Sequence, residues 1–243
     1  MNVYEMKTIG QRIAGNPYVG RGIIIGCSDD AKKAVTAYFI MGRSENSRNR
    51  VFVEQGKDLM IKPFDESKVE DPSLIIYYPI RVNGDKLIVT NGDQTDTVND
   101  FLNQGGTFEE ALRTREFEPD GPNWTPRISG MIDFGGADSF TYKMSILKSS
   151  DPDGTACSRY FFEYPALTGV GHFIHTYVTD GSPIPTFLGE PERISIPSDI
   201  DEFTEDIWNN LNQDNKVSLY VRYYDMFTDT VENRLINKHE LED

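Results

Sequence analysis

Cysteine and histidine are scarce in this chain, and their scarcity limits the chemistry to be expected of it. Cys27 and Cys157 are its only cysteines, and neither belongs to a CxxC pair. A disulfide framework is therefore not expected, and we interpret both residues as buried free thiols. His172 and His175 lie three residues apart on an expected strand, where they would point to opposite faces. One metal ion is then not easily bound by both, and we expect no metal site.

Long apolar runs, common enzyme fingerprints and an excess of basic residues are missing as well. No run approaches the ~20 apolar residues that a membrane span needs. Residues 1–10 lack the apolar core of a signal peptide, so we expect a cytoplasmic protein without membrane contact. No HExxH, GxSxG, Walker-type or GxGxxG motif occurs, and no cofactor is expected. With 24 Lys and Arg against 39 Asp and Glu, the net charge of −15 argues against nucleic-acid binding.

Positive charge is nevertheless concentrated in one part of the chain. Residues 1–50 hold eight Lys and Arg against four Asp and Glu, so the remaining residues carry a net charge of −19. Within this part, residues 42–50 contain three arginines, two asparagines and two serines but only one acid. Planar guanidinium groups beside neutral donors suit phosphate and carboxylate oxygens. We interpret the stretch as an anion pocket for a phosphorylated small molecule; the alternative is a polar loop whose arginines pair with the chain's many acids.

Two further loops are expected to form walls of this pocket. Residues 16–22 are punctuated by glycine and proline, and glycines on both sides of Arg21 allow a ligand to approach the backbone closely. Residues 118–127 contain three prolines, which exclude a helix or a central strand and predict a stiff, shaped loop; a mere connection is the alternative. If residues 48–50 are extended, Arg48 and Arg50 share one face and converge on the same anion.

The remaining pattern is one of many strands and few helices. Helices are predicted at 94–103 with Asp93 as the cap, at 107–115 from a capping box, and at 200–211 with Ser198 as the cap. Residues 181–196 are proline-rich and predict a loop. The order of the elements indicates one α+β domain, residues 1–243, with two layered sheets flanked by helices. Strands are predicted at 23–27, 34–41, 51–54, 59–62, 74–82, 86–90, 128–134, 140–147, 159–164, 170–178, 217–224 and 231–236.

Four motifs carry a resemblance to a known family. They are Asn-Pro-Tyr-x-Gly-Arg-Gly at 16–22, Met-Gly-Arg-Ser-x-Asn-Ser-Arg-Asn-Arg at 41–50, Thr-Asn-Gly-Asp at 90–93 and Glu-Pro-Asp-x-Pro-Asn-x-Thr-Pro-Arg-Ile at 118–128. Together they resemble the archaeal-type IMP cyclohydrolase family, apart from Val19, where many relatives have proline. The resemblance implies a four-layer α-β-β-α sandwich like that of the N-terminal-nucleophile hydrolases, without their nucleophile. Asn2 agrees with this, because removal of Met1 would expose no Cys, Ser or Thr.

The resemblance also implies an activity. It is the last step of de novo purine biosynthesis, closure of formamidoimidazole-carboxamide ribonucleotide (FAICAR) to inosine monophosphate (IMP) with loss of water. The ligand would be a purine ribonucleotide, no cofactor is required, and a symmetric homo-oligomer is consistent with the family. Two other functions stay open: a hydrolase of a formyl or amide bond on a related ribonucleotide, and a non-catalytic purine-nucleotide-binding protein.

Residue chemistry suggests a role for each candidate site residue. Arg21, Arg48 and Arg50 would bind phosphate or stabilise the formyl oxygen. Arg43 and the nearby amide and hydroxyl side chains would bind ribose, base or formyl groups, and Tyr18 would stack or transfer protons. A turn or capping role is an equal alternative for the five candidates between residues 91 and 127. The candidate catalytic residues are Tyr18, Arg21, Arg48 and Asn49. The candidate substrate-binding residues are Arg43, Ser44, Asn46, Arg50, Asn91, Asp93, Asp120, Asn123 and Arg127.

Overall fold

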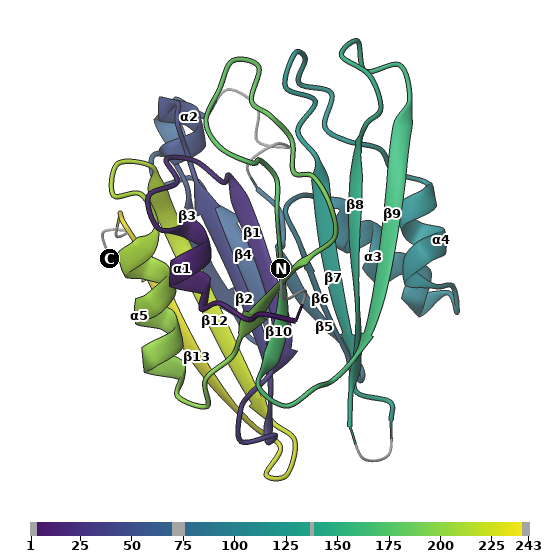
Figure 1. Cartoon of the computed structure of the whole chain (residues 1–243). Coiled ribbons are helices and arrows are strands. Elements are labelled where there is room, and N and C mark those ends of the chain that lie inside the picture. The colour runs from purple at the N-terminus through teal and green to yellow at the C-terminus, as the bar shows by residue number, and fades with distance from the viewer. Residues whose placement is uncertain (1–3, 70–75, 137–138, 240–243) are drawn as a thin grey trace.

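Two antiparallel sheets form the protein (Figure 1). The computed structural model describes residues 4–69, 76–136 and 139–239. The first sheet has the order β11 (Glu192–Ser195), β10 (Val170–His175), β1 (Arg21–Cys27), β2 (Lys33–Met41), β12 (Lys216–Asp225) and β13 (Thr230–Asn237). The second has the order β3 (Val51–Gln55), β4 (Asp58–Lys62), β5 (Ile80–Asn83), β6 (Lys86–Thr90), β7 (Arg127–Asp133), β8 (Thr141–Ser149) and β9 (Cys157–Pro165).

A hydrophobic core fills the space between the two sheets. Ile23 and Ile25 of β1 are fully buried in this core, whereas Ile24 between them is buried on the opposite face of the same sheet. The run of isoleucines is therefore buried on both faces, as the sequence predicted. The sheets approach each other closely at Gly130 of β7. A Cβ atom there would lie 2.5 Å from Cδ1 of Ile25, so only glycine fits without a shift of its neighbours.

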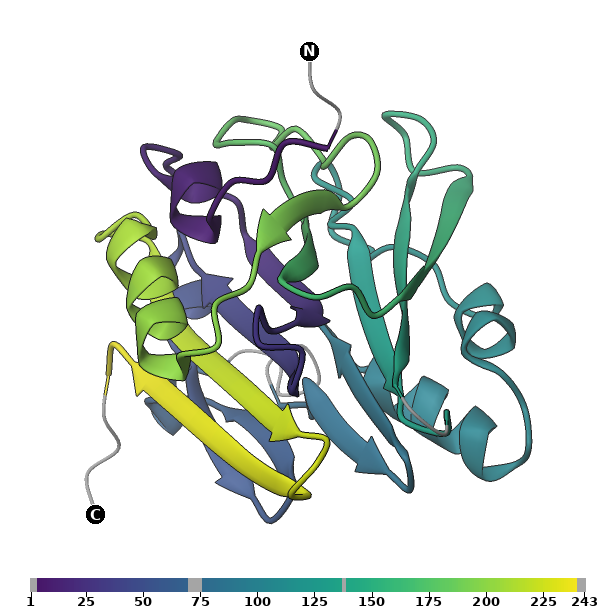
Figure 2. The same cartoon turned by 60° about the horizontal axis from the view of Figure 1, so that its bottom comes forward.

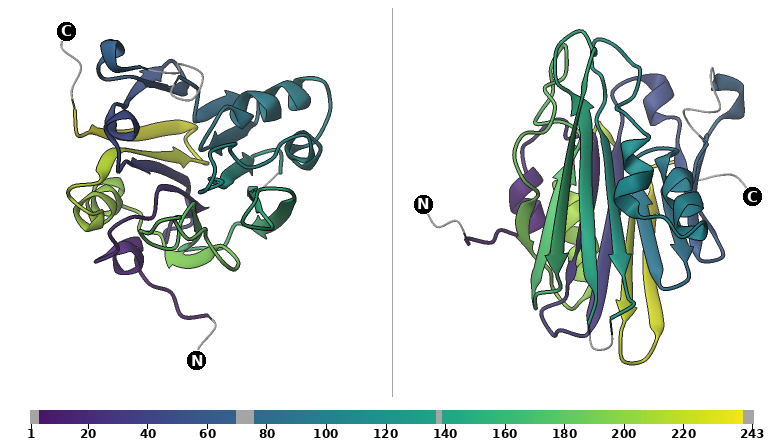
Figure 3. Two further views of the ribbon diagram at one scale, coloured as in Figure 1. Left: turned by 90° about the horizontal axis from the view of Figure 1, so that it is seen from above. Right: turned by 90° about the vertical axis from the view of Figure 1, so that its right-hand side faces the viewer.

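Helices cover the outer face of each sheet (Figures 2 and 3). On the first sheet these are α1 (Ile9–Ile13) and α5 (Ile200–Asn210), which contact each other. On the second sheet they are α3 (Gln94–Asn103) and α4 (Phe108–Arg113). Each pair of helices packs on its own hydrophobic cluster. The expected α+β class is thus confirmed.

Most of the predicted elements are present. The helix predicted at 94–103 matches α3, and Thr107 forms the predicted capping box with Glu110 of α4. The predicted apolar face of α5 is confirmed as well, since Phe203, Ile207 and the following Leu211 are all buried. Burial of each such side chain is worth ~1.5–3 kcal/mol relative to exposure.

Two predicted segments differ because of where proline lies. The strand predicted at 74–82 begins only at Ile80, after Pro79, which has no N–H to donate to a sheet. Residues 74 and 75 of that prediction lie outside the described residues. The opposite error occurs at residues 181–196, which were predicted to form a loop throughout but contain the strand β11. Its four residues follow the last proline of that stretch and pair with β10.

Helix ends and strand ends also depart from the predictions. The cap of α5 is Asp199, not Ser198, because its carboxylate accepts hydrogen bonds from two backbone N–H groups of the first turn. Asp93 occupies the cap position of α3, but its side chain caps nothing, since arginines hold it elsewhere. The strand predicted at 170–178 ends at His175. Cys27 is buried as expected, whereas Cys157 is partly exposed.

Two short α-helices and a 3₁₀ helix (Glu66–Lys68) in the described residues were not predicted. Helix α1 begins after a capping box between Thr8 and Gln11, and its five residues are too few for a periodic pattern. Helix α2 (Glu45–Arg48) lies within the stretch that was predicted to be a loop, where Ser44 caps it by accepting from the Ser47 N–H. Among the described residues, no helix is long and apolar enough to cross a membrane.

Candidate anion-binding site

Two buried arginines interact electrostatically, and one of them follows the end of α2 by two residues. Arg21 begins β1 and Arg50 directly precedes β3; their exposed fractions are 9% and 7%. Arg21 shares a strand face with Ile23 and Ile25, so its side chain is directed into the space between the sheets. The two guanidinium groups interact electrostatically, and each belongs to a different sheet.

The buried pair retains its positive charge. Burial and the neighbouring Arg21 lower the pKa of Arg50, yet arginine pKa values start far above neutrality. Burial also lowers the pKa of Arg21, but Tyr18 and Glu118 outweigh that effect and raise it overall. The Nε atom of Arg21 is buried and finds no hydrogen-bond partner among the described residues. Two like charges in a low-dielectric environment favour the binding of an anion.

Two buried tyrosines lie next to the arginine pair. The hydroxyl groups of Tyr38 and Tyr77 lie 3.2 Å apart, and Tyr77 donates to the backbone oxygen of Asn91 at 2.8 Å. Tyr38 must then donate to Tyr77, which leaves lone pairs on both hydroxyl oxygens near the arginines. Burial raises the pKa of both tyrosines, so they remain neutral near pH 7. Their dipoles stabilise the charge pair without neutralising it.

Glu118 is a site residue that the sequence analysis did not select. Its carboxyl group interacts with Arg21, Arg50 and Arg127, while burial raises its pKa above the ordinary value despite these arginines. The residue is partly buried, and its N–H donates to the oxygen of Thr125 at 2.9 Å. Glu118 is the first residue of the motif at 118–128, and that position was the only available signal.

The loop at 118–127 is shaped by its own polar side chains. Asp120 accepts a hydrogen bond from the Thr125 N–H at 2.6 Å and another from the Thr125 hydroxyl group. Asn123 accepts from the N–H of Ile184 at 3.1 Å, which joins this loop to residues 178–187. Both predicted wall residues thus maintain the loop, and their contact with substrate stays a prediction.

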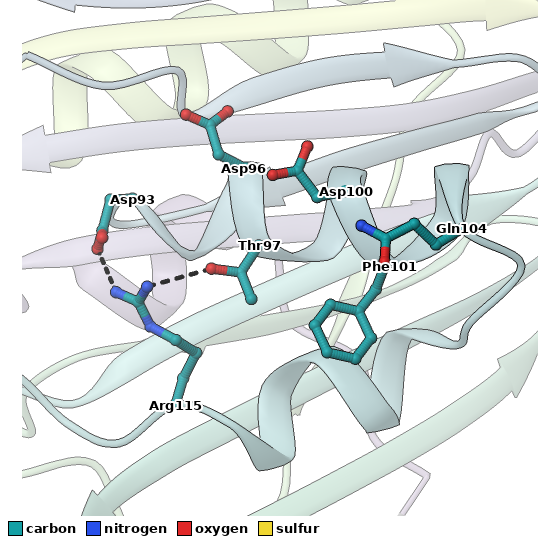
Figure 4. A pocket seen from close by; sticks show the side chains of 7 residues that line it. All are labelled: Asp93, Asp96, Thr97, Asp100, Phe101, Gln104 and Arg115. Carbon is teal, nitrogen blue, oxygen red and sulfur yellow. Dashed lines mark hydrogen bonds and ion pairs between the residues drawn. The ribbon is translucent and has the colours of Figure 1, made fainter.

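Asp93 forms an ion cluster with Arg127 and Arg115 beside α3, and Figure 4 shows the pair of Asp93 and Arg115. Asp93 Oδ1 accepts from Arg127 at 2.8 Å and from Arg115 at 2.6 Å, and Arg115 also donates to Thr97 at 3.1 Å. Burial raises the pKa of Asp93, but the two arginines outweigh it and lower the pKa overall. Asp93 and Arg115 line an open pocket of about 430 Å³ on the helix-covered side of the second sheet. Arg127 links this cluster to the buried site, because it also interacts with Glu118.

Two of the predicted asparagines are engaged by backbone atoms. The amide of Asn91 donates to Pro126 O at 2.9 Å and accepts from the Ile128 N–H at 2.9 Å. Asn49 is bound in the same way to the backbone of Asp65, at 2.7 and 2.8 Å. Each of the two side chains holds a turn of the backbone in place. These two positions of the motifs therefore have a structural role.

Arg43 lies at the exposed rim of the site, over the ring of the buried Tyr18. The Tyr18 ring stacks on Tyr177 with centroids 5.7 Å apart, and the Arg43 guanidinium group lies 5.3 Å from the Tyr18 ring. Arg43 also forms an ion pair with Asp180 and donates to Gly181 O at 2.8 Å. These contacts place an accessible cation outside the buried arginine pair.

Arg48 does not converge with Arg50 as predicted. It lies in a helix rather than in an extended segment, and it donates to Gly42 O at 3.0 Å and to Asn215 Oδ1 at 2.8 Å. The partner of Arg50 is instead Arg21, from a distant part of the sequence. Asn46 lies in the same helix, and its Oδ1 atom is buried without a hydrogen-bond partner in the described part of the chain.

The two histidines on β10 point to opposite faces, as predicted. His172 Nδ1 lies 2.6 Å from the Tyr142 hydroxyl group in the inter-sheet core, and burial lowers its pKa to about 4. His175 Nδ1 donates to Tyr177 O at 2.6 Å and stacks on Phe173 on the other face. Within the described residues, no group of three or more His, Cys, Asp or Glu side chains could hold a metal ion.

The chain is similar to proteins of one known family. A family model described as "IMP cyclohydrolase-like protein" matches residues 18–230. The IMP cyclohydrolase of Methanothrix thermoacetophila is 34% identical over 119 residues, which cover 47% of this chain and 57% of the relative. That of Methanopyrus kandleri is 33% identical over 120 residues, covering 48% and 59%. That of Methanococcus aeolicus is 28% identical over 164 residues, covering 66% and 74%. The chain spans less than two thirds of the length of the first two relatives.

Proposed function

Because the chain belongs to the IMP cyclohydrolase-like family, we propose that it closes the second ring of IMP from FAICAR. The carboxamide nitrogen attacks the formyl carbon, a C–N bond forms, and the former formyl oxygen leaves as water. The water takes one proton from the carboxamide nitrogen and one from the formamido nitrogen. Both reacting groups belong to one substrate, so a site that holds them in contact supplies much of the rate.

The buried pair of Arg21 and Arg50 is the observation that supports this proposal most directly. Negative charge develops on the formyl oxygen as the nitrogen attacks. Fixed donors in a water-poor site stabilise such a charge far better than solvent does. The pair is buried, positively charged and neighboured by two neutral tyrosines, which suits a small developing oxyanion. A hydrated phosphate dianion suits the more exposed Arg43 at the rim.

Glu118 is the group that we assign to proton transfer. Burial raises the pKa of the Glu118 carboxyl group, and the group interacts with Arg21 and Arg50, so it is placed beside the proposed oxyanion site as an acid–base group. In this role it takes the proton from the attacking nitrogen and delivers it to the hydroxyl group that leaves. Tyr38 and Tyr77 stay neutral and act as oriented hydrogen-bonding groups.

We also propose the finer fold assignment. Two facing antiparallel sheets with helices on both outer faces support a four-layer α-β-β-α sandwich of the N-terminal-nucleophile hydrolase type. A core that continues between the sheets supports one domain over residues 1–243. In this assignment the ligand pocket occupies the end of the inter-sheet space.

The test is ring closure by the purified protein. FAICAR is incubated with wild-type protein, with Arg21→Met and with no protein, and absorbance reports the purine product. We expect closure well above the uncatalysed background, and loss of that excess in the variant. Release of formate would instead reveal a hydrolase. A rise in Tm with IMP but no turnover would reveal a non-catalytic binding protein.

A further inference from the structure

We propose that Asp180 is a specificity-determining residue that competes with the substrate phosphate for Arg43. In the absence of substrate it occupies the Arg43 guanidinium group, and a 5′-phosphate displaces it. Asp180 thereby lowers the affinity of the site for a phosphorylated ribonucleoside, because the phosphate must first break this ion pair, and it leaves the affinity for an unphosphorylated ribonucleoside unchanged. The inference rests on the proposed function, because it assigns the phosphate end of the same site.

The geometry of the pair makes an exchange of partners feasible. Arg43 Nη1 contacts both Asp180 Oδ1 and Gly181 O, so the arginine lies against this turn of the loop. The side chains of Arg43 and Asp180 are 35% and 44% exposed, so water and ligands reach both. The contact between Arg43 and the Tyr18 ring does not involve the carboxylate. Arg43 therefore stays directed at the rim after Asp180 has left.

The loop does not depend on this ion pair for its position. Asn16 donates to Val178 O at 2.8 Å, and Asn123 accepts from Ile184 at 3.1 Å. Farther along, Lys148 donates to Phe187 O at 2.8 Å. These three bonds come from three other parts of the chain. Release of Arg43 therefore leaves the loop in place.

The relative strength of the two partners decides which one Arg43 binds. Exposed ion pairs between single charges contribute little to stability, because water screens them and both side chains lose freedom. A phosphate group carries nearly two charges and accepts bidentate bonds from a guanidinium group, which are among the strongest hydrogen bonds in proteins. A phosphate therefore displaces the carboxylate. A neutral nucleoside offers no such exchange.

Arg43 is the arginine of residues 42–50 to which this competition applies. Arg48 donates to two neutral oxygen atoms and meets no carboxylate in the described residues. Arg50 is buried and already interacts with Arg21. Arg43 alone of the three combines an exposed guanidinium group with an acidic partner across the rim.

The test compares IMP with inosine by titration calorimetry at low ionic strength. The Asp180→Asn variant keeps the shape of the side chain and the oxygen that accepts from the Gly181 N–H. We expect it to bind IMP about two- to five-fold more tightly than wild type, with inosine unchanged. The matched control is Asp201→Asn, which removes the same charge from the exposed ion pair that Asp201 of α5 forms with Arg234 of β13. This control should bind both ligands like wild type.

A second variant shows whether the effect passes through Arg43. Arg43→Met should weaken IMP binding, and Asp180→Asn should have no effect on IMP in that background. The proposal is overturned if Asp180→Asn leaves IMP binding unchanged, tightens inosine binding equally, or acts without Arg43. Turnover of FAICAR by a protein that shows any of these results would overturn this proposal alone. Failure of the wild type to bind IMP or turn over FAICAR would overturn the proposed function with it.

Discussion

Replacing Arg50 by methionine should stabilise the folded protein while it weakens nucleotide binding. The Arg50 side chain is buried, and burial together with Arg21 lowers its pKa. A lowered pKa means that the folded state disfavours the charged form of arginine, so this charge reduces stability at every pH at which arginine is protonated. Methionine fills a similar space without charge and should recover that stability.

The expected gain follows from two opposing effects. Replacing buried charged groups by well-packed apolar ones is neutral or stabilising by ~1–4 kcal/mol. Each hydrogen bond that the guanidinium group loses offsets ~0.5–1.5 kcal/mol of this. We therefore expect a net gain of about 1 kcal/mol, which corresponds to a rise in Tm of ~2–4 °C for a chain of this size.

Arg222 provides a matched control for this variant. It is also buried, with 5% exposure, but its guanidinium group donates to Asn233 at 3.1 Å and to Lys57 O at 2.9 Å. Arg222→Met would leave these acceptors without their donor, and we expect a loss of ~1–3 kcal/mol. Urea titrations of wild type and both variants, followed by circular dichroism, give the two free energies under the same conditions.

The reasoning would be refuted if Arg50→Met were destabilised as much as Arg222→Met. Arg50 would then be a structural residue rather than a strained component of an anion site. Calorimetry on the same samples separates the two roles, because IMP affinity should fall at least ten-fold in Arg50→Met and stay unchanged in Arg222→Met. An Arg50→Met variant that binds IMP like wild type would exclude Arg50 from the site.

Three further predictions concern the acid group, the sheet interface and pH. Glu118→Gln should lower kcat for ring closure by ~10²–10⁴-fold, and a loss below three-fold would exclude Glu118 from proton transfer. Gly130→Ala should cost ~1–3 kcal/mol, measured by urea titration, because its methyl group would overlap Ile25; wild-type stability would show that the sheets can separate there. Asp93 has a lowered folded-state pKa, so its ion cluster stabilises the protein above its ordinary pKa of 3.8 and is lost as the pH falls further. Melting curves should therefore show a smaller drop in Tm between pH 5 and pH 3 for Asp93→Asn than for wild type, and equal drops would contradict this.

Local sequence patterns predicted most helices and strands of this fold. They did not predict which residues at the ends of these elements come into contact. The isoleucines of β1 and the capping box at Thr107 are properties of adjacent residues, so the sequence was sufficient for them. The pairing of Arg21 with Arg50 depends on how two sheets face each other. The extended-segment argument therefore chose Arg48 as the partner, when a four-residue helix turns that side chain toward Asn215.

The role of Glu118 illustrates the same limit for chemistry. An acid before a proline at the start of a loop has no distinctive pattern, and its significance comes from the arginines of distant segments that surround it. Conversely, Asn49 and Asn91 lie in distinctive motifs, yet both use their amides to hold backbone atoms. A sequence motif can therefore mark residues that stabilise the fold as well as residues that bind a ligand. Only the contacts of each side chain in the structure distinguish the two roles.

The crossover between β2 and β3 has a consequence for how the protein assembles. The chain leaves the first sheet after Met41 and enters the second at Val51, and Arg50 lies at the end of this crossover. Arg21 remains in the other sheet, so the two cations come together only when the sheets have docked. A folding intermediate with both sheets formed but undocked would have native secondary structure and no anion site. Nucleotide affinity therefore reports docking of the two sheets, and if undocked sheets survive in a denaturant series, affinity should disappear before the circular dichroism signal changes.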